Sequence, residues 1–277
     1  MRGALIALLM ATALMPAAAQ QFSPAPGEDP LHRPFDEILD ANVRDGLVYY
    51  HALKTTRGRL DRYVASLNVP AATYNGWSKP QQMAFWINAY NAFVLETVID
   101  HYPVHGSAQG APSNSIRQIP GAFDRTAWRA AGRSVTLDAI EKTILPEFKE
   151  PRLYLALGRG AVGSGRLRSE AYTADRLEKQ LADIQAEFVT NHEMLQIDRD
   201  NNTMVVTPIV SWHDAAFIEA YDRGDPLFSA RSPIERAIVA FITPNLLPLE
   251  KEFVQQNRFK VAFGTFDWHL NDLTGRS

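Results

Sequence analysis

The chain contains no cysteine among its 277 residues. This absence excludes a thiol nucleophile, a cysteine-ligated metal, a disulfide and a thiol redox switch. The chain also has little excess charge, because 28 Lys and Arg stand against 31 Asp and Glu, a formal net charge of −3. A general electrostatic affinity for nucleic acid is therefore not expected. What remains, 46% hydrophobic and 21% charged residues, is typical of a globular protein with a sizeable core.

The first nineteen residues have the pattern of a secretory signal peptide. Arg2 supplies a positive start, residues 4–14 form a small and apolar run, and Ala17-Ala18-Ala19 provides an A-x-A cleavage pattern. The run is short for a membrane span of roughly 20 residues, although a retained N-terminal anchor is the alternative. We predict cleavage after Ala19 and a periplasmic or secreted protein with no integral membrane span in its mature form.

The rest of the chain is expected to form one domain. Residues 20–34 contain four prolines and predict an extended lead-in, and no repeat or linker interrupts residues 35–277. Apolar periodicity and turn residues predict these elements: helices at 35–46, 60–67, 80–102, 137–145, 173–191, 214–221, 233–242 and 246–255, and strands at 152–157, 194–197, 203–209 and 259–266. The fold class is therefore α+β, a single helix-rich domain around a small, mostly antiparallel sheet.

The strongest helical signal covers residues 80–102. Ser78 can cap this helix, Pro80 suits its first turn and Pro103 ends it. The segment is apolar nearly all round, which is typical of a buried helix. Asn88 and Asn91 lie on one face and require partners when buried. They could form a polar pocket wall or brace the helix internally, and the sequence leaves both possibilities open.

A glycine-rich loop at residues 158–165 follows the predicted strand 152–157. Glycines allow backbone N–H groups to approach an anion closely. Gly158, Gly160 and Gly163 have the G-x-G-x-x-G spacing, but no helix follows directly, so a dinucleotide site is not expected and no cofactor is predicted. A second loop, at residues 103–128, is longer than compact domains usually carry without a purpose.

The histidines give no metal-binding pattern. His101 and His105 are four residues apart, but Pro103 breaks the helix that would bring them together, so no metal site is predicted. In Ser211-Trp212-His213-Asp214 we expect Ser211 or Asp214 to cap the next helix and Trp212 to lie in the core. No G-x-S-x-G motif of a serine hydrolase is present.

Several ordered motifs give the chain a resemblance to a known family. They are AFWINAYNA at residues 84–92, HYP at 101–103, SIR at 115–117, TLDAIE at 136–141, PR at 151–152, EAYTA at 170–174, and FDW with LN at 266–268 and 270–271. Together they resemble the DUF547 family, which is named for its unknown function, and the resemblance covers roughly residues 49–271. It implies a single domain of that family.

Four positions depart from the family pattern. The pattern has histidine where this chain has Lys142 and Tyr154, and cysteine where it has Arg159 and Ser164. A cysteine near a histidine is typical of an activated thiolate, and two of each could bind a metal. Either chemistry would be lost here, which indicates a divergent member without the family's Cys/His positions.

The resemblance leaves three functional interpretations open. The first is a periplasmic binding or accessory protein, or a degenerate enzyme, whose partner is an unknown small molecule or envelope protein. The second is a hydrolase with Ser164 as nucleophile and Lys142 as base, and the third is an unknown chemistry. The pocket or binding candidates are Trp86, Asn88, Tyr90, Asn91, Arg152, Tyr154 and Arg159.

Overall fold

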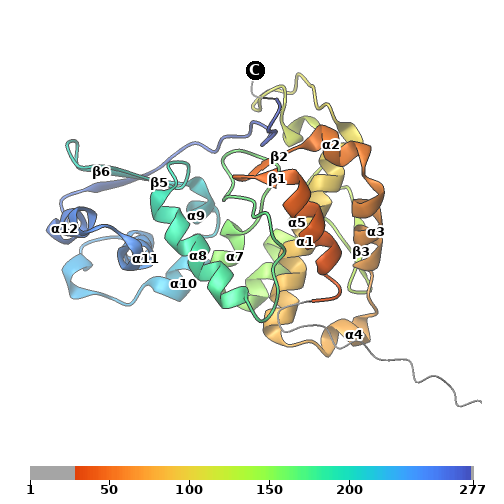
Figure 1. Cartoon of the computed structure of the whole chain (residues 1–277). Coiled ribbons are helices and arrows are strands. Elements are labelled where there is room, and N and C mark those ends of the chain that lie inside the picture. Colours follow the sequence, from red (N-terminus) through yellow and green to blue (C-terminus); the bar gives the residue numbers. More distant parts are fainter. Residues whose placement is uncertain (1–28, 276–277) are drawn as a thin grey trace, which may run out of the picture.

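The computed structural model describes residues 29–275 (Figure 1). The predicted signal peptide at residues 1–19, and residues 20–28 of the lead-in, lie outside this range. In the described part helices predominate over short strands, which confirms an α+β fold. No helix in residues 29–275 is long and apolar enough to cross a membrane.

The helices and strands have the following bounds. The helices are α1 (Arg33–Asn42), α2 (Tyr50–Thr55), α3 (Gly58–Ser66), α4 (Ala71–Asn75), α5 (Lys79–His101), α6 (Leu137–Ala139), α7 (Arg152–Leu155), α8 (Leu177–Thr190), α9 (Pro208–Trp212), α10 (Asp214–Tyr221), α11 (Pro233–Ile242) and α12 (Pro248–Gln256). The strands are β1 (Val43–Arg44), β2 (Leu47–Val48), β3 (Trp128–Ala130), β4 (Arg133–Val135), β5 (Leu195–Asp198), β6 (Thr203–Val206) and β7 (Lys260–Phe263). Ile140–Ile144 forms a π-helical turn, and 3-10 turns cover Ile116–Gln118, Leu145–Phe148, Pro226–Phe228 and Thr243–Asn245.

Helix α5 is the centre of the core, as its sequence predicts. The Ser78 side chain accepts from the Gln81 N–H and Gln81 bonds back to the Ser78 N–H, so a capping box starts the helix. Every residue from 84 to 95 is buried, and α2, α3 and α6 pack against the helix. Trp86 is fully buried, and its Nε1 donates to the Tyr74 hydroxyl at 2.7 Å. Trp86 is therefore part of the core.

The strands form three separate small sheets rather than one. β1–β2 and β3–β4 are two-stranded and antiparallel. The third has the order β5–β6–β7; its hairpin β5–β6 is antiparallel as predicted, but β7 pairs with β6 in parallel. The parallel pairing follows from the crossover, because α9 to α12 intervene between β6 and β7 and return the chain in the same direction.

The prediction of a strand at residues 152–157 is wrong, because residues 152–155 form the short helix α7. The segment RLYLAL contains no β-branched residue, and leucine, alanine and arginine are good helix formers. Pro151, immediately before the first helical residue, has a φ of −68° that is compatible with a helix start. A short apolar run cannot be assigned by periodicity alone, which explains the error.

The segment after β7 returns to the first half of the molecule (Figure 1). Ala161 forms a bridge with Leu270, and Val48 forms one with Asp272. The Tyr50 hydroxyl donates to Asn271 Oδ1 at 2.6 Å. This segment therefore connects the part of the fold that holds β5 to β7 with the part around α5.

Candidate functional site

A buried glutamate, Glu141, lies at the centre of the candidate site. Thr136 caps α6 through the Ala139 N–H, and the chain continues into the π-helical turn that contains Glu141 and Lys142. Such turns often occur at functional sites. Here the turn buries Glu141, whereas the Lys142 side chain is 66% exposed and donates to Asp138 at 2.7 Å.

Arg159, at the first cysteine position of the family pattern, is the main partner of Glu141. Its side chain is almost completely buried, and Nη2 donates to Glu141 Oε1 at 2.6 Å. Nη1 donates to the carbonyl oxygens of Tyr154 at 3.0 Å and Leu157 at 3.3 Å, whereas Nε has no partner. A buried charge requires an opposite charge and hydrogen bonds, and this position supplies both.

Three ring side chains complete the arrangement around Glu141. His213 Nε2 lies 2.9 Å from Glu141 Oε1 and must carry the hydrogen, because a carboxylate only accepts. The imidazole stacks on Tyr154, with ring centroids 3.6 Å apart and planes 4° from parallel. The Tyr90 hydroxyl donates to Glu141 Oε2 at 3.1 Å. We call Glu141, Arg159, His213, Tyr90 and Tyr154 the Glu141 cluster.

The electrostatics of the Glu141 cluster favour an ionised carboxylate. Burial acts to raise the pKa of Glu141, but the charge of Arg159 and the hydrogen bonds from His213 and Arg159 outweigh it and hold the pKa well below its ordinary value. Burial and the nearby carboxylate raise the pKa of Tyr154 to about 12. Burial also raises the pKa of Tyr90 well above its ordinary value. Both tyrosines therefore stay neutral, and both carboxylate oxygens of Glu141 already have donors.

The segment Ser211-Trp212-His213-Asp214 does not have the capping and core roles that the sequence predicted. Helix α10 has no side-chain cap at its start, and Trp212 is 44% exposed rather than in the core. The Trp212 ring lies 5.9 Å from Cζ of Arg159. His213 instead bonds to Glu141, 72 residues earlier in the chain, so this segment contributes to the site and not to helix capping.

The glycine-rich loop does not form an anion cradle, because its backbone packs against the C-terminal segment. The N–H groups of Val162 and Gly163 donate to the carbonyls of His269 and Asp267 at 2.9 and 2.8 Å. A Cβ atom on Gly163 would lie 2.6 Å from the Asp267 nitrogen, so only glycine permits this approach. The loop therefore serves to bring the chain past Arg159 and against the C-terminal segment.

The structure does not bring Ser164 and Lys142 together. Ser164 is buried and its Oγ has no hydrogen-bonding partner, so Lys142 Nζ is not within bonding distance of it. Ser164 lines a small pocket of about 200 Å³ together with Asn191 and Glu193, among others. Of the four departures from the family pattern, Tyr154 and Arg159 thus belong to the Glu141 cluster, whereas Lys142 and Ser164 do not.

Asn88 and Asn91 brace α5 against two loops. Asn88 donates to the Tyr172 carbonyl and accepts from the Tyr172 N–H, at 2.8 and 2.9 Å. Asn91 donates to the Ala156 carbonyl at 3.1 Å and accepts from the Gly158 N–H at 2.8 Å. These contacts are those of internal bracing, the second of the two interpretations that the sequence left open.

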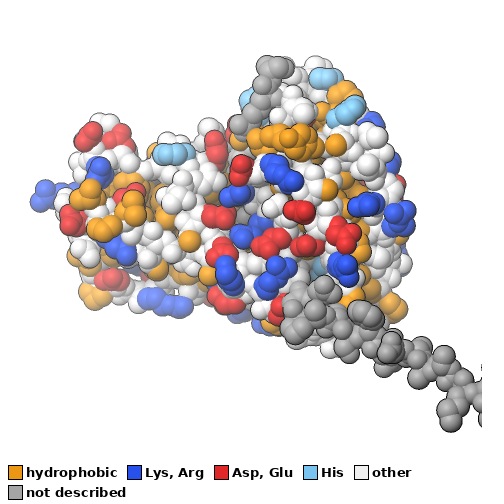
Figure 2. Space-filling model, in the orientation of Figure 1, with side chains coloured by type: hydrophobic (Ala, Val, Ile, Leu, Met, Phe, Trp, Pro, Cys, Tyr) orange, Lys and Arg blue, Asp and Glu red, His pale blue; other side chains and the backbone are white. Residues whose placement is uncertain are grey.

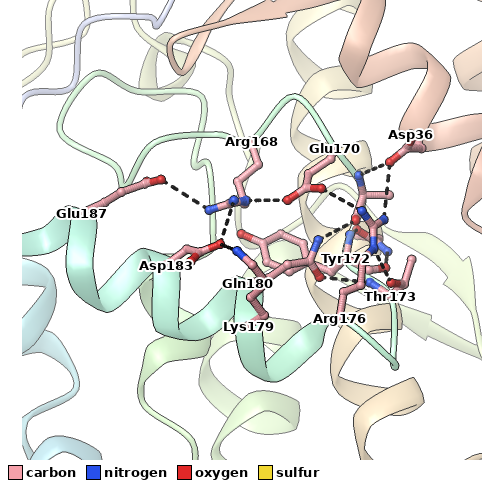
Figure 3. A network of polar contacts seen from close by, with 12 residues as sticks. Asp36, Arg168, Glu170, Tyr172, Thr173, Arg176, Lys179, Gln180, Asp183 and Glu187 are labelled. Atoms are coloured by element: carbon pink, nitrogen blue, oxygen red, sulfur yellow. Dashed lines mark hydrogen bonds and ion pairs between the residues drawn. The ribbon is translucent and has the colours of Figure 1, made fainter. Parts of the chain in front are cut away.

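Arg152 and Glu170 of the EAYTA motif belong to a partly exposed network of charged side chains, whereas Ala171, Tyr172 and Thr173 of the motif are buried. Figure 2 shows acidic and basic side chains alternating across the face that carries this network, and Figure 3 shows the network closely. Arg168 contacts Glu170, Asp183 and Glu187 at 3.0, 3.5 and 3.4 Å, and Arg176 contacts Glu170 at 2.9 Å. Arg152 similarly joins Glu150 to Glu178 of α8. These ion pairs hold the segment before α8 against that helix, and they neutralise the charges of Arg168, Glu170 and Arg176.

A cleft with a volume of about 690 Å³ lies beside the returning C-terminal segment. We call it the C-terminal cleft. Residues 110–112 of the long loop, the end of β6 and residues 264–269 form its walls. Phe266 and Trp268 supply aromatic surface, with ring centroids 4.4 Å apart, and Glu193 and Asp267 supply carboxylates. In residues 29–275, no group of three or more His, Asp or Glu is placed to hold a metal ion.

Residues 74–189 match the family described as "Protein of unknown function, DUF547". This segment belongs to the DUF547 family. The match contains α5, the π-helical turn, α7 and the glycine-rich loop, and therefore every member of the Glu141 cluster except His213. No curated protein and no solved structure gives a significant match.

Sequence reasoning missed two residues of the site, Glu141 and His213. Glu141 is the last residue of the TLDAIE motif, and it could have been found by asking which carboxylate pairs with an arginine inside a glycine-rich loop. His213 lies beyond the matched segment and gives no comparable signal, because its contact with Glu141 depends on tertiary packing.

Proposed function

We propose that this DUF547 protein is an exported binding or accessory protein without nucleophilic catalysis at the Glu141 cluster. The observation that carries the proposal is the buried Arg159–Glu141 pair. Its guanidinium occupies the position at which the family resemblance expects a cysteine, and Arg cannot lose its proton to become a nucleophile. The pattern of residues 1–19 supports export.

The surroundings of Ser164 also favour binding over hydrolysis. A serine nucleophile requires a base within hydrogen-bonding reach. Ser164 Oγ has no partner, and Lys142 is bound to Asp138 at the surface. The C-terminal cleft, with its aromatic wall and its volume of about 690 Å³, offers the space for a small ligand.

We expect no covalent labelling of the purified protein by a fluorophosphonate probe of serine nucleophiles. The wild-type protein and Ser164→Ala should give the same background signal, because no base activates the hydroxyl. A serine hydrolase labelled in the same reaction is the positive control. Labelling of the wild type that disappears in Ser164→Ala would overturn the proposal and favour the Ser164/Lys142 hydrolase.

Export predicts a specific mature N-terminus. When the full chain is produced in a bacterium with a periplasm, we expect the processed protein to begin at Gln20 and to appear in the periplasmic or culture fraction. N-terminal sequencing of that fraction measures both. An unprocessed chain that stays with the membrane would support the retained anchor instead.

A further inference from the structure

A second hollow lies in the part of the fold that follows the DUF547 match. It has a volume of about 550 Å³, within the range of small-molecule sites, and α11, α12 and the turn Pro226–Phe228 form its walls. Its floor is aliphatic, with Val239, Ala240 and Val254 among the lining residues. Leu227, at its rim, is 50% exposed. We call this hollow the α11–α12 groove.

The charges of the groove are basic and only partly neutralised. Arg236 is paired with Asp222 at 2.7 Å. Arg223 and Lys251 also line the groove, and neither has a carboxylate partner among the described residues. The acidic lining residue, Asp225, accepts from the Leu227 N–H and so caps its own turn. Two cations without ion pairs therefore stand beside an aliphatic floor.

Helix α12, which forms one wall of the groove, begins with exposed apolar side chains. Leu247 and Leu249, at the start of α12, are among the most exposed large hydrophobic residues of the described chain. Figure 2 shows hydrophobic side chains on this lobe, over α11 and α12, with basic side chains beside them. Exposed apolar surface of this kind marks binding sites when it borders a hollow.

We propose that the α11–α12 groove binds a long-chain fatty acid or a closely similar acyl anion. The aliphatic floor matches an acyl chain, and Arg223 and Lys251 match its carboxylate. A neutral alkyl compound would leave both cations without a partner, and a cationic one would be repelled. The groove is separate from the Glu141 cluster and from the C-terminal cleft, so this proposal and the proposed function can fail independently.

The test is displacement of a fluorescent fatty acid, dansyl-undecanoic acid, from the full chain by unlabelled fatty acids below their micelle concentrations. We expect competition to strengthen roughly four-fold for each added methylene from decanoate to tetradecanoate, as burial of a CH₂ group predicts. Dodecanol and dodecylammonium should compete at least ten-fold less well than dodecanoate. Dodecanoate binding should weaken as the salt concentration rises, because salt screens the attraction between the carboxylate and the two cations.

Two variants test separately the contributions of the two cations and of the aliphatic floor to dodecanoate binding. Arg223→Glu combined with Lys251→Glu should weaken dodecanoate binding at least ten-fold, and Ala240→Trp should abolish it by filling the groove. Arg199→Glu, an exposed charge reversal in the β5–β6 turn, is the matched control and should bind normally. Because Arg223 is exposed and Lys251 only half-buried, the reversal tests the proposal even where Ala240→Trp fails to fold.

Any one of the following results would overturn the proposal. They are the absence of displaceable binding, equal competition by dodecylammonium, and a double charge reversal that leaves the affinity for dodecanoate within two-fold. Binding of the protein to anionic phospholipid vesicles without any binding of free fatty acid would assign the surface to a membrane instead, and would also overturn it.

Discussion

Arg159→Met is expected to lower the free energy of unfolding by about 3–5 kcal/mol at neutral pH. The variant keeps most of the apolar volume of the side chain but leaves the Glu141 carboxylate buried without its cation. His213 and Tyr90 still donate to that carboxylate, but neither supplies the permanent charge of a guanidinium. Urea unfolding followed by circular dichroism measures the change.

Two further variants show whether the unpaired carboxylate is the cause. Glu141→Gln, added to Arg159→Met, removes the buried charge and is expected to restore at least half of the lost stability. Arg166→Met is the matched control, because its ion pair with Asp45 is exposed and should contribute less than about 1 kcal/mol. Equal instability of the single and double variants would show that the carboxylate has no part in the loss.

The same pair predicts a dependence on pH. In the folded protein the pKa of Glu141 is lower than its ordinary value of 4.5. The unfolded chain therefore takes up the proton first as the pH falls. The stability that the ionised carboxylate contributes is complete above pH 4.5 and is lost progressively below it. In Arg159→Met burial instead favours the protonated acid, so the deficit relative to the wild type should shrink as the pH falls from 7 to about 4.

Much of the helical framework could be predicted because its signals are local. Ser78, Pro80 and Pro103 delimit α5 almost to the residue, and Ser232 with Glu235 forms the same kind of capping box at the start of α11. The hairpin β5–β6 follows from apolar runs on either side of a polar turn. Neither the parallel pairing of β7 nor the helical state of residues 152–155 could be predicted, because both depend on what the chain packs against.

The candidate site was harder to predict than the fold for the same reason. The comparison with the family pattern pointed to Arg159 and Tyr154, and both lie in the Glu141 cluster. The carboxylate that Arg159 requires lies 18 residues away, and the histidine lies 72 residues from that carboxylate. Side chains at such separations meet only through tertiary packing, and a single sequence does not show how far apart they lie in the fold.

A second pH-dependent loss of stability is expected at higher pH, from a different group. His32 is buried at the start of α1, where its Nδ1 and the Tyr63 hydroxyl form a hydrogen bond at 2.8 Å. Burial lowers the pKa of His32 from 6.5 to about 4, although the charge of Asp29 partly opposes this shift. His32 therefore remains neutral in the folded protein at a pH at which the unfolded chain is already protonated.

The direction in which the free energy of unfolding changes with pH follows from the lowered pKa of His32. The unfolded chain binds the additional proton between pH 6.5 and about 4, so the free energy of unfolding should fall as the pH falls through that window. The expected loss is about 3 kcal/mol, from 1.36 kcal/mol for each pKa unit. His32→Gln keeps a hydrogen-bonding group for Tyr63 without a titrating ring, and should flatten the pH dependence in this window. Urea unfolding at several pH values measures the slope, with the exposed His51→Gln as the control. A slope in His32→Gln equal to that of the wild type would show that protonation of the buried imidazole does not destabilise this fold.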